Sequence, residues 1–180
     1  MLSTNLTGPT AASGRSRARE LPTIRAICFR SGGYEFALPM AVVLKVTHCP
    51  PLDNGDWSRS GLVYIDSQLI QVLDLALLLD CPERSPKGMG QFLVIARSGN
   101  TLCGLPTDSP PDSIDLPRDQ VLPLPARFER SPLAHLAQCA VVLSPDTTPR
   151  TLFLLSLPQA LDQANAVMGT TASSSPGSVS

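Results

Sequence analysis

Prolines and glycines break this chain into short segments. The 180 residues include eighteen prolines and twelve glycines, which recur along most of the sequence. Both residue types interrupt regular helices, so they disfavour long helices and favour short strands joined by turns. Apolar residues still make up 43% of the chain, which is enough to build the core of one domain. We therefore expect a mainly β protein with one domain.

Pairs of apolar segments separated by turn residues predict four hairpins. The predicted strand pairs are 24–30 with 34–38, 62–65 with 69–73, 91–96 with 102–105, and 136–143 with 152–155. Turn-forming residues such as Gly, Ser, Asn and Asp occupy the connections. Asp74 occupies the position of a helix N-cap before a short apolar turn at 75–79.

The apolar strand segments also supply a predicted core, because all of its members lie in strand runs of apolar character. The predicted core residues are Ile27, Phe29, Phe36, Val72, Leu73, Val94, Leu102, Val142 and Phe153.

Composition divides the chain into one domain and two tails. Residues 1–21 are rich in Ser, Thr, Gly and Arg, and the end of the chain is rich in Ser. Neither end carries apolar periodicity, which is typical of segments that cannot bury a core. We expect residues 1–21 and 167–180 to be disordered and residues 22–166 to form the domain.

Two segments of twelve residues resemble each other. Residues 69–80 and 151–162 each begin as an apolar strand, continue through a cap-like residue and end as a short apolar helix. One interpretation is a protein of two similar lobes, each closed by such a unit. The other is that apolar strand-to-helix junctions look alike in general.

Charge and cysteine content exclude several classes of function. The net charge is −1 and only 16% of the residues are charged, so nothing favours binding to nucleic acid or to an anionic membrane. The five cysteines are odd in number and include no CxxC motif, and no apolar signal segment or bilayer-long apolar stretch is found. We expect free thiols, a cytoplasmic location and no direct membrane insertion.

No motif for catalysis is found, so we expect a non-enzyme without a cofactor. Ser31, Gly32 and Gly33 precede a strand and not the helix that a phosphate-binding loop requires.

One metal hypothesis remains open, because His48, Cys49, His135 and Cys139 carry the ligand types that zinc prefers. Against it, adjacent strand residues such as His48 and Cys49 point to opposite faces. Cys139 also lies in an apolar run, where a buried thiol is the usual case. We expect no metal.

Three segments, taken in order, resemble the CheW-like family. Residues 28–40 combine a glycine turn, an aromatic residue and Ala-Leu-Pro, as in the family's opening hairpin. Residues 61–75 align without a gap to Gly-apolar-apolar-Asn-apolar-Arg-Gly-x-apolar-apolar-Pro-apolar-apolar-Asp-Leu. Residues 104–108 and 120–125 are similar to the family's Gly-apolar-x-x-Asp and apolar-x-Pro-x-Pro segments.

The resemblance spans about residues 23–162 and implies an all-β fold. It implies two SH3-like five-stranded β-barrel lobes with one or two short helices. It also implies a non-catalytic adaptor that links methyl-accepting chemoreceptors to a CheA-type histidine kinase, for chemotaxis, phototaxis or pilus motility. The alternatives are a divergent CheW-like protein without kinase coupling and the His/Cys metal-binding protein described above.

The second segment departs from the family pattern at four positions. Tyr64 replaces Asn, Asp66 replaces Arg, Ser67 replaces Gly and Gln71 replaces Pro. An Asp-Ser pair can still turn, although less comfortably than Arg-Gly where a positive φ is needed. In the family this hairpin contributes to partner contacts. The resemblance therefore implies that Tyr64, Asp66, Ser67 and Gln71, together with Lys45, bind a partner.

The charges at Lys45 and Asp66 are the reverse of the family's. The family often carries Glu at the first position and Arg at the second, and the two are neighbours in its fold. Two unrelated surface changes would explain the reversal, as would an ion pair kept with exchanged signs. We favour the exchange, because one reversal alone would place like charges together. We predict that the two side chains lie within salt-bridge reach and that this chain substitutes poorly for an ordinary CheW.

Overall fold

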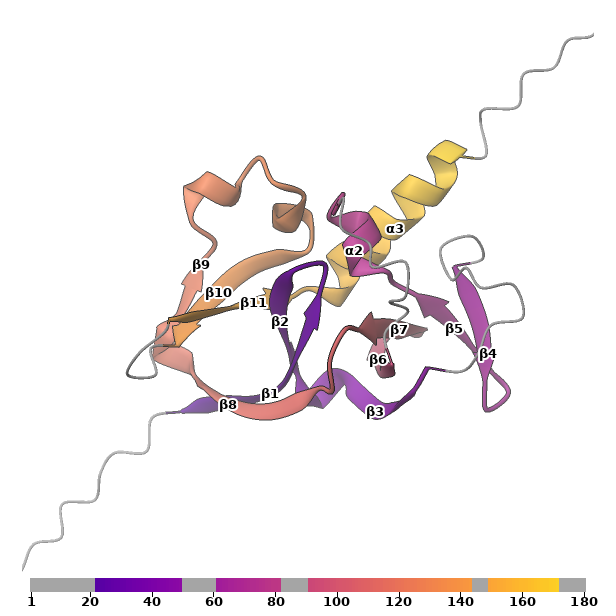
Figure 1. Ribbon diagram of the computed structural model, residues 1–180, viewed down its shortest axis with the longest axis horizontal. Coiled ribbons are helices and arrows are strands. Elements are labelled where there is room, and N and C mark those ends of the chain that lie inside the picture. Colours follow the sequence, from indigo (N-terminus) through magenta and orange to yellow (C-terminus); the bar gives the residue numbers. More distant parts are fainter. Residues whose placement is uncertain (1–21, 50–60, 82–90, 144–148, 172–180) are drawn as a thin grey trace, which may run out of the picture.

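The computed structural model describes residues 22–49, 61–81, 91–143 and 149–171. Within them, eleven strands form two sheets, accompanied by two α-helices and short 3₁₀ turns (Figure 1). The predicted tail at residues 1–21 lies outside the described residues. So does most of the second predicted tail, from residue 172 onward.

The first sheet joins strands from the beginning and the end of the domain. In spatial order its strands are β8 (Asp112–Pro117), β1 (Thr23–Ser31), β2 (Tyr34–Pro39), β11 (Arg150–Leu155), β10 (Ala137–Leu143) and β9 (Val121–Pro123). The pairs β1–β2 and β10–β11 are antiparallel hairpins, as predicted. The two hairpins meet where β11 runs parallel to β2, with Phe153 opposite Phe36.

The second sheet comes from the middle of the chain. In spatial order its strands are β3 (Val43–His48), β6 (Phe92–Ser98), β7 (Thr101–Thr107), β5 (Gln68–Val72) and β4 (Leu62–Ile65). The pairs β4–β5 and β6–β7 are the remaining two predicted hairpins. They meet where β5 runs parallel to β7, with Gln71 opposite Cys103.

The all-β, two-lobed fold class is therefore confirmed, with one difference in detail. The first sheet has six strands because β9, from the proline-rich segment, pairs with β10. A strand of three residues with a proline at its end carries too little alternation to be recognised in the sequence.

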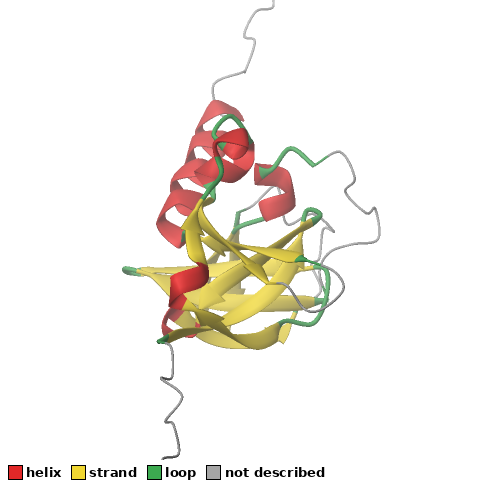
Figure 2. Cartoon of the chain, turned by 90° about the vertical axis from the view of Figure 1, so that its left-hand side faces the viewer, coloured by secondary structure: helices red, strands yellow, loops and turns green. Residues whose placement is uncertain are grey.

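A strand-to-helix unit is repeated in the two lobes, which supports the first interpretation of the sequence repeat. In each lobe the strand that makes the parallel pairing leads into a helix: β5 into α2 (Leu75–Leu78) and β11 into α3 (Leu157–Thr171). The Asp74 carboxylate accepts a hydrogen bond from the Leu77 N–H at 3.1 Å, which confirms the predicted N-cap. The two helices pack against each other at one end of the strands (Figure 2).

The second helix is longer than the sequence suggested. α3 continues five residues past the predicted domain boundary at residue 166. Pro158 falls in the first turn, where proline is tolerated, and no proline or glycine follows before Gly169. Leu157, Ala160 and Ala164 bury one stripe of the helix in the core.

One large core lies between the two lobes. It takes side chains from both sheets and both helices, and a smaller apolar cluster packs within each sheet. Seven of the nine predicted core residues are buried, and Leu102 is half-buried. Val142 is 50% exposed, so its prediction as a core residue is wrong. Val141 packs in the smaller cluster of the first sheet, and Val142 lies on the opposite face of the strand, which it shares with the buried Ala140.

Candidate functional site

The β4–β5 hairpin presents an exposed apolar surface at one end of the second sheet. Val63 and Ile65 pack into the core cluster of that sheet. The alternate side chains face outward: Leu62 is 50% exposed, Tyr64 is 74% exposed and Leu69 is 47% exposed. The outward-facing set, called the hairpin face below, consists of Leu62, Tyr64, Leu69 and Gln71.

The hairpin turns at Asp66 and Ser67, and both residues have positive φ. The angles are 49° at Asp66 and 63° at Ser67. Two successive left-handed residues form the type I′ turn, whose twist matches that of the flanking strands. Asp tolerates this conformation better than most residues, whereas Ser67 occupies a position that favours glycine. The turn is therefore formed at a cost in backbone strain.

Replacing Ser67 with glycine is expected to stabilise the domain by about 0.5–1 kcal/mol. A left-handed residue with a Cβ costs about 1–2 kcal/mol, and the greater freedom of glycine in the unfolded chain offsets about 0.4–1 kcal/mol of that relief. Urea unfolding measures the change. Gln68→Gly, one residue later at a position without positive φ, is the control and should destabilise. Equal effects of the two substitutions would contradict the strain at Ser67.

Lys45 and Asp66 form an ion pair beside this turn. The Lys45 ammonium contacts Oδ2 of Asp66. Lys45 lies on β3 and Asp66 follows β4, and these strands are the two edges of the second sheet. The pair therefore connects the two edges where the sheet curls. The side chains are 45% and 73% exposed, so the pair contributes only about 0–1 kcal/mol to stability. The prediction of salt-bridge reach is confirmed.

The structure thus places all five candidate residues on β3 or on the β4–β5 hairpin. Tyr64, Asp66 and Ser67 lie at or next to the turn, and Lys45 contacts Asp66. Gln71 lies further along β5, where its side-chain amide donates a hydrogen bond to Oδ1 of Asn165 at 2.9 Å. Asn165 belongs to α3, and its contact with Gln71 was not predicted from the sequence. That these residues bind a partner stays a prediction.

Comparison with known proteins identifies the family. The family model of the CheW-like domain matches residues 25–164. The chain belongs to the CheW-like family. The crystal structure of the scaffolding protein TtCheW from Thermoanaerobacter tengcongensis is similar, with a TM-score of 0.58 and 14% identity. The similarity covers 76% of this chain and 90% of that chain, and at this identity it concerns the fold. No curated protein matches the sequence.

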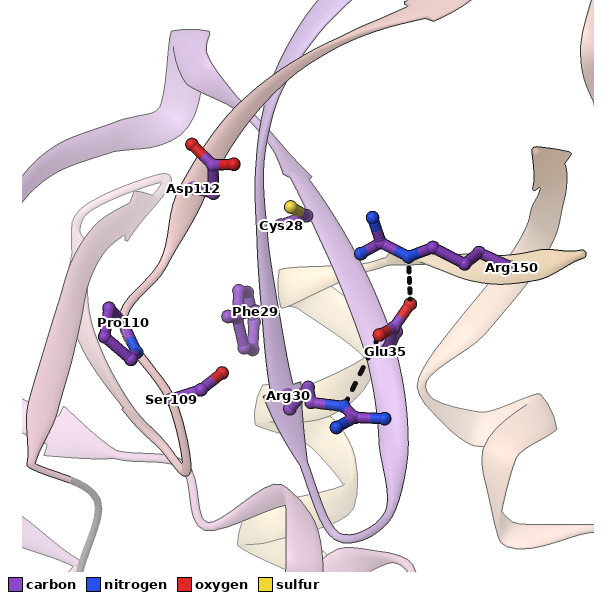
Figure 3. Close-up of a pocket in the computed structure, with 8 residues that line it drawn as sticks. All are labelled: Cys28, Phe29, Arg30, Glu35, Ser109, Pro110, Asp112 and Arg150. Atoms are coloured by element: carbon purple, nitrogen blue, oxygen red, sulfur yellow. Dashed lines mark hydrogen bonds and ion pairs between the residues drawn. The ribbon is translucent and has the colours of Figure 1, made fainter. Parts of the chain in front are cut away.

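A small charged pocket lies on the first sheet of this CheW-like domain (Figure 3). Its volume is about 130 Å³. Glu35 lies between two arginines there, 3.0 Å from Nε of Arg150 and 3.4 Å from Nε of Arg30. The hydrogen bond from Arg150 to Glu35 raises the pKa of that guanidinium. Glu35 thereby ties β2 to both β1 and β11, and its single carboxylate offsets one of the two arginine charges.

The four residues of the metal hypothesis do not form one site in the CheW-like domain. His48 and Cys49 are on or next to β3 in the second sheet, whereas His135 and Cys139 belong to the strand β10 and the turn before it. The His48 ring packs against Phe92, with centroids 5.1 Å apart. Burial raises the pKa of the Cys49 thiol, as in a structural cysteine. Among the described residues no three His, Cys, Asp or Glu side chains are grouped as metal ligands.

The five cysteines of the CheW-like domain are free thiols, and two of them, Cys28 and Cys103, are buried. Cys103 is fully buried, and this burial raises its pKa to about 11. In the part of the chain that the structure describes, no helix is long and apolar enough to cross a membrane.

A second exposed apolar surface, on β9 and β10, was missed in the sequence. Leu122 is 59% exposed and Val142 is 50% exposed. Leu122 pairs with Ala140, two residues from Val142 on the same strand. The proline-rich context of Leu122 concealed its position in a sheet. Val142 shares a strand face with Ala140, which is buried in the large core, so apolar alternation alone does not distinguish the two.

Proposed function

We propose that this protein is a non-catalytic adaptor that links methyl-accepting chemoreceptors to a CheA-type histidine kinase. Membership of the CheW-like family supports this function, as does the similar fold of TtCheW, which is a scaffolding protein. The observation that carries the proposal is the hairpin face. It exposes three large apolar side chains beside an accessible ion pair. Contiguous apolar area with a polar border is typical of a protein-docking surface.

Docking of this kind requires a fixed surface and no bond chemistry. The inward side chains of the β4–β5 hairpin pack into the core of the second sheet, which holds the hairpin face in place. The proposed partners are proteins. The proposal includes no nucleic acid, membrane insertion or cofactor, and it places the protein in the cytoplasm with the kinase.

Reconstitution tests this function directly. The full chain would be mixed with purified CheA-type kinase of the same cell and with vesicles that contain a chemoreceptor, and kinase autophosphorylation would be followed. We expect the chain to bind the kinase and to make its activity depend on the receptor. Tyr64→Ala should weaken binding, whereas Val167→Ala, a truncation of an exposed apolar residue on α3, should not. A wild-type chain that does not bind the kinase would overturn the proposal.

A second candidate function is that of a CheW-like protein that binds within the complex without coupling the kinase. The exchanged charges at Lys45 and Asp66 favour it, because they change the electrostatic character of the hairpin tip. The same reconstitution separates the two functions. An adaptor changes receptor-dependent kinase activity, whereas the second candidate binds the receptor or kinase and leaves that activity unchanged or lowers it by competition.

Asp66→Arg is expected to weaken binding to the native partner about tenfold or more. The new cation lies beside Lys45 and meets a partner surface that was complementary to a carboxylate, and like charges at an interface are strongly rejected. Titration calorimetry with the purified partner measures the loss. Asp119→Arg makes the same charge change on an exposed turn next to β8 and should have little effect.

The double variant Lys45→Glu, Asp66→Arg separates the local pair from partner recognition. It restores opposite charges within the pair, so it should recover the thermal stability of the wild type. It should not recover affinity for the native partner. If Asp66→Arg binds as tightly as the wild type, Asp66 does not select the partner.

A further inference from the structure

The C-terminal helix connects the two lobes at the border of the hairpin face. α3 follows β11 of the first sheet, but it packs against α2 and β6, which belong to the second lobe. Its Asn165 accepts the hydrogen bond from Gln71, a residue 94 positions earlier in the chain. A helix anchored in one lobe therefore contacts the outward side of a strand in the other.

Gln71 belongs to the same outward surface as the exposed apolar residues. It lies directly opposite Leu62 in the β4–β5 pairing, and Leu62 is 50% exposed. Opposite residues on one face of an antiparallel pair are in contact range. The conformation of the Gln71 side chain therefore affects what a protein docked on Leu62 encounters.

Asn165 is well placed to hold that side chain in one conformation. Its neighbour Ala164 is buried, and Leu157 and Ala160 bury the same stripe of α3 in the core between the lobes. A rigid helix thus presents the Asn165 carbonyl to a glutamine with several freely rotating bonds. Ordering such a side chain before binding reduces the entropy that binding must otherwise overcome.

We propose that the docking surface extends from the hairpin face onto α3, and that Asn165 is a positioning residue that orders Gln71 for the partner. The inference rests on the proposed function, and the occupant is the same CheA-type kinase. Both lobes then contribute to one docking surface, although the hairpin face comes from the second lobe alone. Asn165 acts through Gln71, and its effect is on affinity.

The test is a double-mutant cycle on the full chain. Affinity for purified CheA-type kinase would be measured by titration calorimetry for the wild type, Gln71→Ala, Asn165→Ala and the double variant. Loss of one side-chain hydrogen bond is expected to weaken binding about 2–10-fold in each single variant. The double variant should be no weaker than the weaker single variant, because both substitutions remove the same interaction.

Two further variants separate positioning from simple structural support. Val167→Ala lies two residues from Asn165, about 200° around the helix, and should bind like the wild type. Exchange of the two residues, as Gln71→Asn with Asn165→Gln, keeps a donor and an acceptor and should restore affinity to within about twofold. All binding would be measured at a temperature where circular dichroism shows every variant to be folded.

The outcomes distinguish this inference from the function on which it rests. If the wild type binds the kinase and Asn165→Ala binds equally well, the positioning role is wrong and the adaptor function stands. If the losses in the two single variants add in the double variant, Gln71 and Asn165 act separately and the inference is again wrong. If the wild type does not bind the kinase, both the adaptor function and the extended surface are wrong.

Discussion

Replacing Phe153 with alanine is expected to destabilise the domain by about 3–5 kcal/mol, the usual cost of removing a buried aromatic ring. Phe153 is 5% exposed and lies on β11 at the seam between the two hairpins of the first sheet. Its ring contacts those of Tyr34, Phe36 and Phe128, with centroid distances of 5.7, 6.4 and 5.6 Å. The substitution would therefore leave a cavity where three elements meet.

Urea unfolding of the variant measures this loss, since the midpoint falls while the slope reports whether unfolding stays cooperative. Domains of this size have a total stability of about 5–15 kcal/mol, so the loss is a large fraction of it. Val142→Ala is the matched control on the adjacent strand β10. Because Val142 is 50% exposed, its truncation should cost less than about 1 kcal/mol. A loss of that size at Phe153 would mean that its ring is not part of the core.

The hairpins were predictable because they depend on local signals. Each combines an apolar alternation with turn residues a few positions apart, and all four form in the structure. The Asp74 cap is equally local, since donor and acceptor are three residues apart. Local chemistry of this kind is visible in the sequence without knowledge of the fold.

The structure differs from the sequence predictions at features that depend on residues far apart in the chain. Val141 and Val142 are chemically alike, and both faces of β10 carry buried residues, because Ala140 packs in the large core and Val141 in the smaller cluster. How far each core extends along the strand decides that Val142 is exposed. The length of α3 is decided in part by its packing against α2 and β6. Propensity alone does not set the length of a helix whose stability comes from such contacts.

The contacts of the candidate site also divide into those that were predicted from the sequence and those that only the fold determines. The Lys45–Asp66 pair was predicted because the family resemblance supplied the proximity of two positions 21 residues apart. The Gln71–Asn165 and Glu35–Arg150 contacts join residues 94 and 115 positions apart. No motif marks them. The Glu35–Arg150 contact follows from the pairing of strands from both ends of the domain in the first sheet, and the Gln71–Asn165 contact follows from the packing of α3 on the second lobe.

Gly32→Ala is expected to cost about 2–4 kcal/mol, the combined cost of a left-handed alanine and of overpacking. Gly32 lies in the β1–β2 turn with φ of 58°. A Cβ built on it would lie 3.0 Å from the Ala76 Cα and 3.2 Å from the Cys81 Sγ. The turn of the first lobe is thus pressed against α2 of the second, and the nearest atom is backbone that cannot rotate away.

Hydrogen bonds fix the same contact, so the clash is not easily relieved by moving the turn. The Cys81 thiol donates to the Gly32 carbonyl at 3.0 Å. The Asp108 carboxylate accepts from the Gly32 N–H, although burial raises the pKa of Asp108 overall. Moving Gly32 away from α2 would strain or break both interactions, and a buried polar group left without its partner adds to the cost.

Gly33→Ala is the control that separates steric contact from backbone strain. Gly33 also has positive φ, at 78°, but nothing lies within 4 Å of its added Cβ. It should therefore show only the conformational cost of about 1–2 kcal/mol. Urea unfolding of both variants gives the comparison, and the excess loss at Gly32 measures the packing between the lobes. If both substitutions cost the same, the turn of the first lobe does not press on α2.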